Sequence, residues 1–171
     1  DADMRRPSIH KFFDLDNING LSNLITDATL TIEDVLLKTS VPNLDIITAG
    51  IIPPDPVYLL SSNRMKEITK NIDLLNYDYV VFDAPPSETL ADPKVLAKYC
   101  DLSLFLDTLN KVQKESAKKV IKQFLDISEG KTGVILNYLK ENYSFLNNYK
   151  YSYKYNYNAD IYKYYKKDSD N

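Results

Sequence analysis

Short, mainly apolar runs alternate with amphipathic stretches along the chain, and this alternation predicts strands separated by helices. The runs occupy residues 44–48, 79–82, 102–106 and 133–136. We expect the last three to be strands buried in a parallel sheet, because they are short and almost wholly apolar. Strands that alternate with helices favour an α/β fold, a mostly parallel sheet that is flanked by helices and joined by right-handed crossovers.

Apolar residues at steps of three and four, together with capping residues, predict helices between the runs. We expect six: 8–13, 20–26, 31–37, 62–75, 92–98 and 111–127. Thr31 is the expected N-cap of the third, and Asp92, followed by Pro93, that of the fifth. Three prolines predict a rigid loop over 51–56 instead of a helix. The last helix should turn an apolar stripe inward: Val112, Val120, Ile121, Phe124 and Leu125.

The composition fits one compact domain with an acidic body. The chain has 171 residues, of which 44% are hydrophobic. The formal net charge is −3; residues 149–171 hold five lysines against three aspartates, so they carry +2 and residues 1–148 carry −5. This balance argues against nucleic acid as the main partner. A single cysteine excludes an internal disulfide, and no apolar run approaches the ~20 residues that span a bilayer.

Three carboxylates stand where chemistry is expected. Asp1 and Asp3 lie two positions apart, so in extended chain they project to the same side and can share a metal or a proton. Asp83 follows the apolar run 79–82, at a strand end of the kind where α/β sheets bind ligands. A carboxylate there can hold a magnesium shell. The alternatives are a solvated turn for the pair and a capping role for Asp83.

Four features, in this order along the chain, carry a resemblance to a known family: Asp1-x-Asp3-x-Arg5-x-Pro7, Thr48-Ala49-Gly50 with Pro53-Pro54-x-Pro56, Asp83-x-Pro85-Pro86, and a tyrosine-rich tail. Together they resemble the bacterial tyrosine kinases of capsular and exopolysaccharide assembly. That family belongs to the deviant-Walker P-loop class, which also contains the MinD/ParA ATPases, and its first motif is called Walker A′. Two departures are Ala84, where a hydroxyl residue is usual, and Tyr58, where glutamate is frequent.

The resemblance implies a site for ATP and Mg²⁺. Asp1 and Asp83 would organise the magnesium shell, and Asp3 would accept or orient the proton of an incoming tyrosine hydroxyl. Arg5 would steady phosphate or a local ion-pair network. Asn137 resembles the family residue that hydrogen-bonds the adenine edge, and a turn-forming asparagine is the alternative.

The phosphate-binding loop is expected elsewhere. No G-x-x-x-x-G-K-[ST] sequence occurs in the 171 residues, which contain four glycines. The chain starts at Asp1, directly on a motif that should close a strand. We therefore expect residues 1–142 to be the C-terminal portion of a P-loop kinase catalytic domain whose Walker A loop lies upstream, and residues 143–171 to be a separate tail.

The tail is dominated by eight tyrosines separated mainly by Lys, Asn and Ser: Tyr149, Tyr151, Tyr153, Tyr155, Tyr157, Tyr162, Tyr164 and Tyr165. This low-complexity composition favours a flexible segment. We expect its tyrosines to be phosphoacceptors; a sticky end produced by biased composition is the alternative.

The expected function is therefore that of an ATP-dependent protein-tyrosine autokinase that regulates polysaccharide polymerisation and export. The resemblance implies a membrane co-polymerase as activator, fused or separate, a cognate tyrosine phosphatase, a homo-oligomer, and a location at the cytoplasmic face of the plasma membrane. Two other functions stay open: a MinD/ParA-like ATPase switch and a non-catalytic adaptor. The tail favours the kinase, since a positioning ATPase needs no tyrosine cluster.

Overall fold

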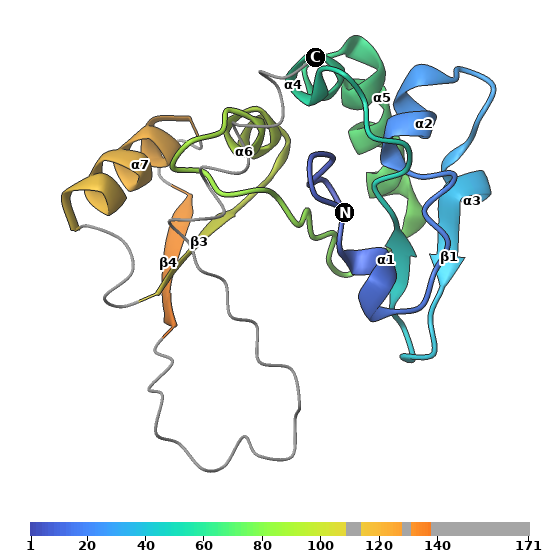
Figure 1. The fold of residues 1–171 in the computed structure, drawn as a ribbon, viewed down its shortest axis with the longest axis horizontal. Coiled ribbons are helices and arrows are strands. Elements are labelled where there is room, and N and C mark those ends of the chain that lie inside the picture. The colour runs from blue at the N-terminus through green and yellow to red at the C-terminus, as the bar shows by residue number, and fades with distance from the viewer. Residues whose placement is uncertain (109–113, 128–130, 138–171) are drawn as a thin grey trace, which may run out of the picture.

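The structure is a computed structural model that describes residues 1–108, 114–127 and 131–137 (Figure 1). Its elements follow in chain order: α1 (Ile9–Phe12), α2 (Leu21–Thr26), α3 (Ile32–Val35), β1 (Leu36–Lys38), β2 (Asp45–Ile47), α4 (Pro56–Leu60), α5 (Asn63–Ile72), the 3₁₀ turn η1 (Asp73–Leu75), α6 (Asp92–Leu96), the 3₁₀ turn η2 (Ala97–Tyr99), β3 (Ser103–Thr108), α7 (Lys114–Ile127) and β4 (Thr132–Asn137). The architecture is α/β, as the alternation along the sequence predicts.

The expected helices form, with two corrections in the first half of the chain. Thr31 caps α3 as predicted, but this helix ends at Val35 instead of continuing to residue 37. Residues 36–38 turn extended because they pair with β2 in an antiparallel hairpin, in which Leu36 lies opposite Ile47. The second correction concerns Pro56, which begins α4 because the first turn of a helix tolerates proline.

The N-cap of the fifth expected helix lies one residue before the predicted one. Ala91 is the N-cap of α6, and Asp92 is its first residue. The carboxylate of Asp92 makes no capping bond; it bonds instead to Arg5, which is distant in the sequence. The next helix upstream, α5, is capped by Ser62, whose hydroxyl accepts a bond from the Met65 amide at 3.1 Å.

Residues 79–82 do not form the buried strand that their apolar run predicts. Tyr79 is 88% exposed and Val81 is 84% exposed. Within the described part of the chain, the one backbone hydrogen bond that joins this neighbourhood to another segment runs from the Ala2 nitrogen to the Asp83 oxygen, at 2.8 Å. Burial on both faces requires a partner on each edge and cover on each side, and the described residues do not supply these.

The second half contains the parallel pair that the sequence predicts. β3 and β4 run parallel from Ser103 opposite Thr132 to Thr108 opposite Asn137, with α7 as the crossover between them. The prediction that β3 is buried on both faces is wrong, since Leu104 is 54% exposed and Leu106 is 65% exposed. Only the face that carries Phe105 packs against α7. Leu125, expected inside, is also exposed, and Val112 lies outside the described residues.

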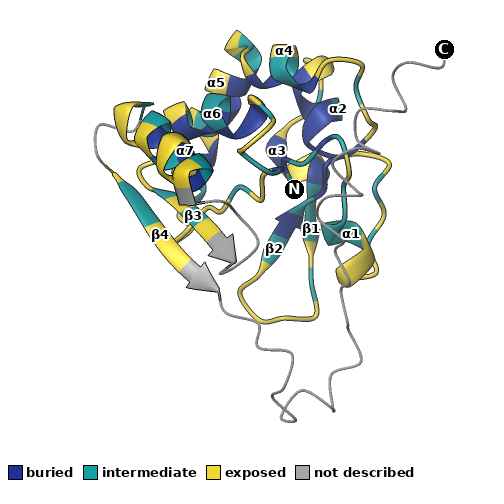
Figure 2. Ribbon diagram, turned by 60° about the vertical axis from the view of Figure 1, so that its left-hand side comes forward, coloured by how far each residue is buried: buried dark blue, intermediate teal, exposed yellow. Residues whose placement is uncertain are grey.

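Two clusters of buried residues form the core (Figure 2). The larger joins the first residues of the chain to α2, α3, α5 and α6, with Met4, Leu24 and Met65 among its members. The smaller consists of Ala97, Val120 and Phe124. Leu96 belongs to the first cluster and Ala97 to the second, so the α6–η2 segment connects them. No helix in the described ranges is both long enough and apolar enough to cross a membrane.

Candidate active site

The first five residues alternate between the core and a polar side. Ala2 and Met4 are 0% exposed and belong to the larger core cluster, while Asp1, Asp3 and Arg5 are partly exposed. The main-chain nitrogen of Asp1 donates to the Ile47 oxygen of β2 at 2.7 Å, and that of Ala2 donates to the Asp83 oxygen. This alternation turns Ala2 and Met4 into the core and leaves the two carboxylates outside it.

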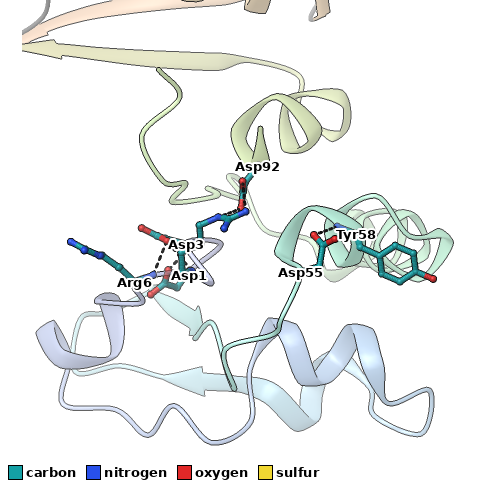
Figure 3. A network of polar contacts seen from close by, with 7 residues as sticks. Asp1, Asp3, Arg6, Asp55, Tyr58 and Asp92 are labelled. Carbon is teal, nitrogen blue, oxygen red and sulfur yellow. Dashed lines mark hydrogen bonds and ion pairs between the residues drawn. The ribbon is translucent and has the colours of Figure 1, made fainter. Parts of the chain in front are cut away.

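Both carboxylates of this motif bind backbone amides (Figure 3). Asp1 Oδ1 accepts from the Asp3 nitrogen, and Asp1 Oδ2 accepts from the nitrogens of Ser8 and Ile9, each at 3.1 Å. The last two bonds satisfy amides at the start of α1. Asp3 Oδ1 accepts from the nitrogens of Arg5 at 3.1 Å and Arg6 at 2.9 Å. The carboxylates therefore hold a series of tight turns instead of lying along a regular strand.

Asp83 is the carboxylate best placed to bind a cation. In the described part of the chain its side chain makes no hydrogen bond or ion pair, although its main-chain oxygen accepts a hydrogen bond from the Ala2 nitrogen. Partial burial raises the pKa of Asp83, the amino group of Asp1 lowers it by less, and the Asp3 carboxylate raises it by a smaller amount still; the residue as a whole is exposed. A cation at this place would relieve the unfavourable environment that burial and a like charge create.

The residues present fit a magnesium ion held mainly by water and phosphate. Among the described residues there is no group of three or more His, Cys, Asp or Glu side chains that could hold a metal. Magnesium in nucleotide sites uses only one or two carboxylates and keeps several waters. Asp83 meets this requirement directly. Asp1 meets it in part, because three backbone amides already occupy its oxygens and about four lone-pair positions exist.

Arg5 forms an ion pair whose partner, Asp92, the sequence did not indicate. Its Nε lies 2.9 Å from Asp92 Oδ1, and its Nη2 lies 3.3 Å from Asp92 Oδ2. The side chain of Asp92 is 0% exposed and that of Arg5 29% exposed. Of the two roles expected for Arg5, the structure shows the ion pair. An aspartate before a proline is typical of a helix N-cap, and Asp92 was predicted to be one. Nothing in the sequence pattern therefore indicated that Asp92 is the ion-pair partner of Arg5.

The Thr48-Ala49-Gly50 motif has a packing role. Gly50 has φ +79°, and a Cβ there would lie 2.2 Å from Asn23 Oδ1. Its amide donates to Asn17 Oδ1 and its oxygen accepts from Asn17 Nδ2, each at 2.9 Å. The Thr48 oxygen accepts from the first amide of α2 at 2.8 Å. These contacts fix the start of the 51–55 loop, whose predicted place beside the site stays a prediction.

The remaining candidates are placed in part or not at all. Asn137 ends β4, as predicted, and its backbone pairs opposite Thr108; its adenine-binding role stays a prediction. Tyr58 lies exposed on α4, where its amide donates to Asp55 Oδ1 at 3.0 Å (Figure 3). All eight tail tyrosines, from Tyr149 to Tyr165, lie outside the described residues.

Known proteins resemble this chain in sequence. No family model matches it. CapB of Staphylococcus aureus, which is named as a tyrosine-protein kinase, is 39% identical over 138 residues, covering 80% of this chain and 59% of CapB. The tyrosine-protein kinase YwqD of Bacillus subtilis strain 168 is 34% identical over 137 residues, covering 80% of this chain and 57% of YwqD. The chain thus spans less than two thirds of the length of these relatives.

The fold resembles a solved kinase domain as well. The crystal structure of the VpsO kinase domain superposes with a TM-score of 0.72 at 30% sequence identity, covering 81% of this chain and 68% of that domain. The sequence comparison and the fold comparison therefore both find proteins that are named as kinases.

Proposed function

Because the chain belongs to the bacterial tyrosine-protein kinases of capsule and exopolysaccharide biosynthesis, we propose that it forms part of the catalytic domain of an ATP-dependent protein-tyrosine autokinase. The observation that carries this proposal is the seam between the Asp1–Asp3 turns and Asp83. The backbone hydrogen bond from Ala2 to Asp83 holds the two motifs together. The pKa of Asp83 is raised, mainly by partial burial and to a smaller degree by the Asp3 carboxylate.

Membership in a kinase family implies nucleotide binding, and we assign ATP and Mg²⁺ to this seam. Asp83, with help from Asp1, would hold the metal, which supplies charge neutralisation at the transferring phosphate. Asp3 would accept or orient the proton of the tyrosine hydroxyl. Two backbone amides already fix one of its oxygens. Phosphoryl transfer depends mainly on such positioning. Arg5 and Asn137 would support the site, the first through its ion pair and the second at the adenine.

The phosphate-binding loop would come from a part of the same domain outside these 171 residues. A groove of about 940 Å³ lies between the 77–88 segment and β3. Apolar side chains that border it, such as Val81 and Leu106, are largely exposed. The relatives contain residues beyond the matched part. A strand seated in this groove would cover these side chains, pair with 79–82 and lead into the loop. Residues 1–142 would then be the C-terminal portion of the domain.

The tail from 143 to 171 would supply the phosphoacceptors. Each phosphate adds roughly −1.5 to −2 charges at neutral pH, so two would reverse the +2 of residues 149–171 and turn attraction toward the acidic body into repulsion. Phosphorylation should therefore release the tail and loosen a homo-oligomer that exchanges tails. A membrane co-polymerase, a tyrosine phosphatase and a position at the cytoplasmic face of the plasma membrane complete the proposal.

Mass spectrometry of the full-length protein after incubation with Mg·ATP tests this function. We expect phosphate on several of the eight tail tyrosines. Tyr99 serves as the internal control, because its hydroxyl donates to the Leu60 oxygen at 3.0 Å and should stay unmodified. Hydrolysis of ATP with an unmodified tail would instead favour a MinD/ParA-like ATPase switch, and neither activity would favour an adaptor.

A further inference from the structure

The Arg5–Asp92 pair joins the catalytic turns to the element that follows Asp83. Its two bonds, at 2.9 and 3.3 Å, match the planar fork of a guanidinium to both oxygens of one carboxylate. Such a pair fixes orientation as well as distance. Asp92 is itself held rigidly, since it is fully buried and begins α6, whose Leu96 belongs to the same core cluster as Ala2 and Met4.

Arg5 is also part of the turn that holds Asp3. Its main-chain nitrogen donates to Asp3 Oδ1, while its side chain reaches Asp92. A change in the direction of the Arg5 side chain would therefore be transmitted through one residue to the carboxylate of Asp3. A buried ion pair adds little net stability compared with apolar side chains of similar size, so fold stability alone gives a weak reason for charges at these two positions.

We propose that Asp92 is a positioning residue of the kinase: by gripping the Arg5 guanidinium from α6, it fixes the Asp3 turn relative to Asp83. The inference rests on the proposed function, because it concerns the same reaction. Asp92 acts through Arg5 and touches neither substrate nor nucleotide. Its loss should lower the rate of phosphoryl transfer while leaving ATP binding intact.

The first test compares two substitutions in the full-length protein. Asp92→Asn keeps the shape of the side chain but removes its charge. Asp45→Asn makes the same change in the Lys38–Asp45 pair, whose atoms lie 2.6 Å apart and whose side chains are 80% and 12% exposed. For Asp92→Asn we expect the initial rate of tyrosine phosphorylation at saturating ATP to fall roughly 10- to 100-fold, the range that misplaced catalytic groups produce. The apparent KM for ATP should stay within about twofold. Asp45→Asn should change neither quantity.

The variant Asp92→Glu separates a positioning role from a mere need for a charge. It restores the carboxylate but moves it by one methylene group, so it should recover only part of the rate. A wild-type rate per folded molecule in Asp92→Asn would overturn the proposal, and so would a loss that appears only as a raised KM for ATP.

A paired variant keeps the test decisive if Asp92→Asn does not fold, since one charge left alone in the core is costly. Arg5→Met combined with Asp92→Leu removes both charges and should fold. We expect its rate to be as low as that of Arg5→Met alone, because the two side chains act as one unit. A wild-type rate in the folded double variant, or losses that simply multiply, would contradict the proposal. If the wild-type protein itself forms no phosphotyrosine, the proposed function fails before this comparison begins.

Discussion

The two halves of the described chain are built differently. Residues 1–75 surround a continuous core, with Met4, Leu24 and Met65 fully or almost fully buried. Residues 79–137 form a thinner structure, in which an extended segment and one parallel strand pair leave Val81, Leu104 and Leu106 largely exposed. In Figure 2 the dark blue residues gather around α2 and α3, whereas the described parts of β3 and β4 are yellow and teal.

The difference teaches where the candidate site depends on long-range structure. Asp1, Asp3 and Arg5 belong to the well-packed half, whereas Asp83 belongs to the open one. Asp92 is buried at the start of α6, whose Leu96 joins the core of the first half. The Ala2–Asp83 backbone bond and the Arg5–Asp92 ion pair connect them. The candidate site therefore lies on the boundary between a well-packed half and a half whose apolar side chains are largely exposed.

The largest effect should come from a substitution in the well-packed core, compared with one on an exposed strand of the open half. In the 171-residue chain, Leu24→Ala should lower the free energy of unfolding by about 2–5 kcal/mol, because it leaves a cavity in close packing. Leu106→Ala should change it by roughly 0.5 kcal/mol or less, since the side chain is 65% exposed. Urea unfolding measures both.

The same pair of variants tests the proposed strand in the groove. In the full-length protein, Leu106→Ala should become clearly destabilising, because a strand seated there would cover its side chain. An equally small effect in both contexts would argue against that strand.

A smaller effect is expected at Gly50. Gly50→Ala should destabilise the chain by about 1–3 kcal/mol, because alanine is strained at φ +79° and its Cβ would collide with Asn23. Gly133→Ala is the matched comparison in the open half: its Cβ would meet only the flexible Leu104 side chain, at 2.9 Å. A similar loss at both positions would show that the two halves are equally rigid.

The smallest expected effect concerns the pH dependence of stability. Burial, with Asp3 nearby, raises the pKa of Asp83 in the folded state, so the folded chain retains a proton that the unfolded chain releases. The resulting stabilisation is complete below the ordinary aspartate pKa and is lost as pH rises through the folded pKa. Asp83→Asn should therefore be stabilising at pH 7, by roughly 0.5 kcal/mol or less for this exposed group, and neutral near pH 3. Melting temperatures at the two pH values check the sign.

Local periodicity predicted most helices and strands. It could not predict which apolar runs are buried or where α3 ends, because both depend on long-range contacts. The helix expected over 62–75 forms as α5, and its Met65, Ile68 and Ile72, spaced by three and four, are all buried. The runs at 79–82 and 102–106 predicted extended chain that is apolar, but their burial depends on what packs on each face. The end of α3 at Val35 depends on pairing with β2, which helix propensity does not contain.

The candidate site divides in the same way. Motif spacing brought Asp1, Asp3 and Asp83 to attention, and the structure shows the backbone link between their segments. Motif spacing could not reveal that Asp1 and Asp3 accept hydrogen bonds from backbone amides, because turns of this kind depend on local dihedral angles. Arg5 and Asp92 are separated by 87 positions, and a single sequence contains no signal for such a pairing.

The most direct test of the kinase assignment is the phosphotyrosine content of the full-length Asp83→Ala variant after incubation with Mg·ATP. Asp78→Ala is the matched control, because it makes the same change at an exposed carboxylate of the same connecting segment. We predict that Asp83→Ala loses at least about 100-fold of the phosphorylation rate, the scale of removing one key electrostatic group, while the variant still melts in a cooperative transition. Asp78→Ala should keep the wild-type rate. Near-normal phosphorylation in the folded Asp83→Ala variant would contradict the account.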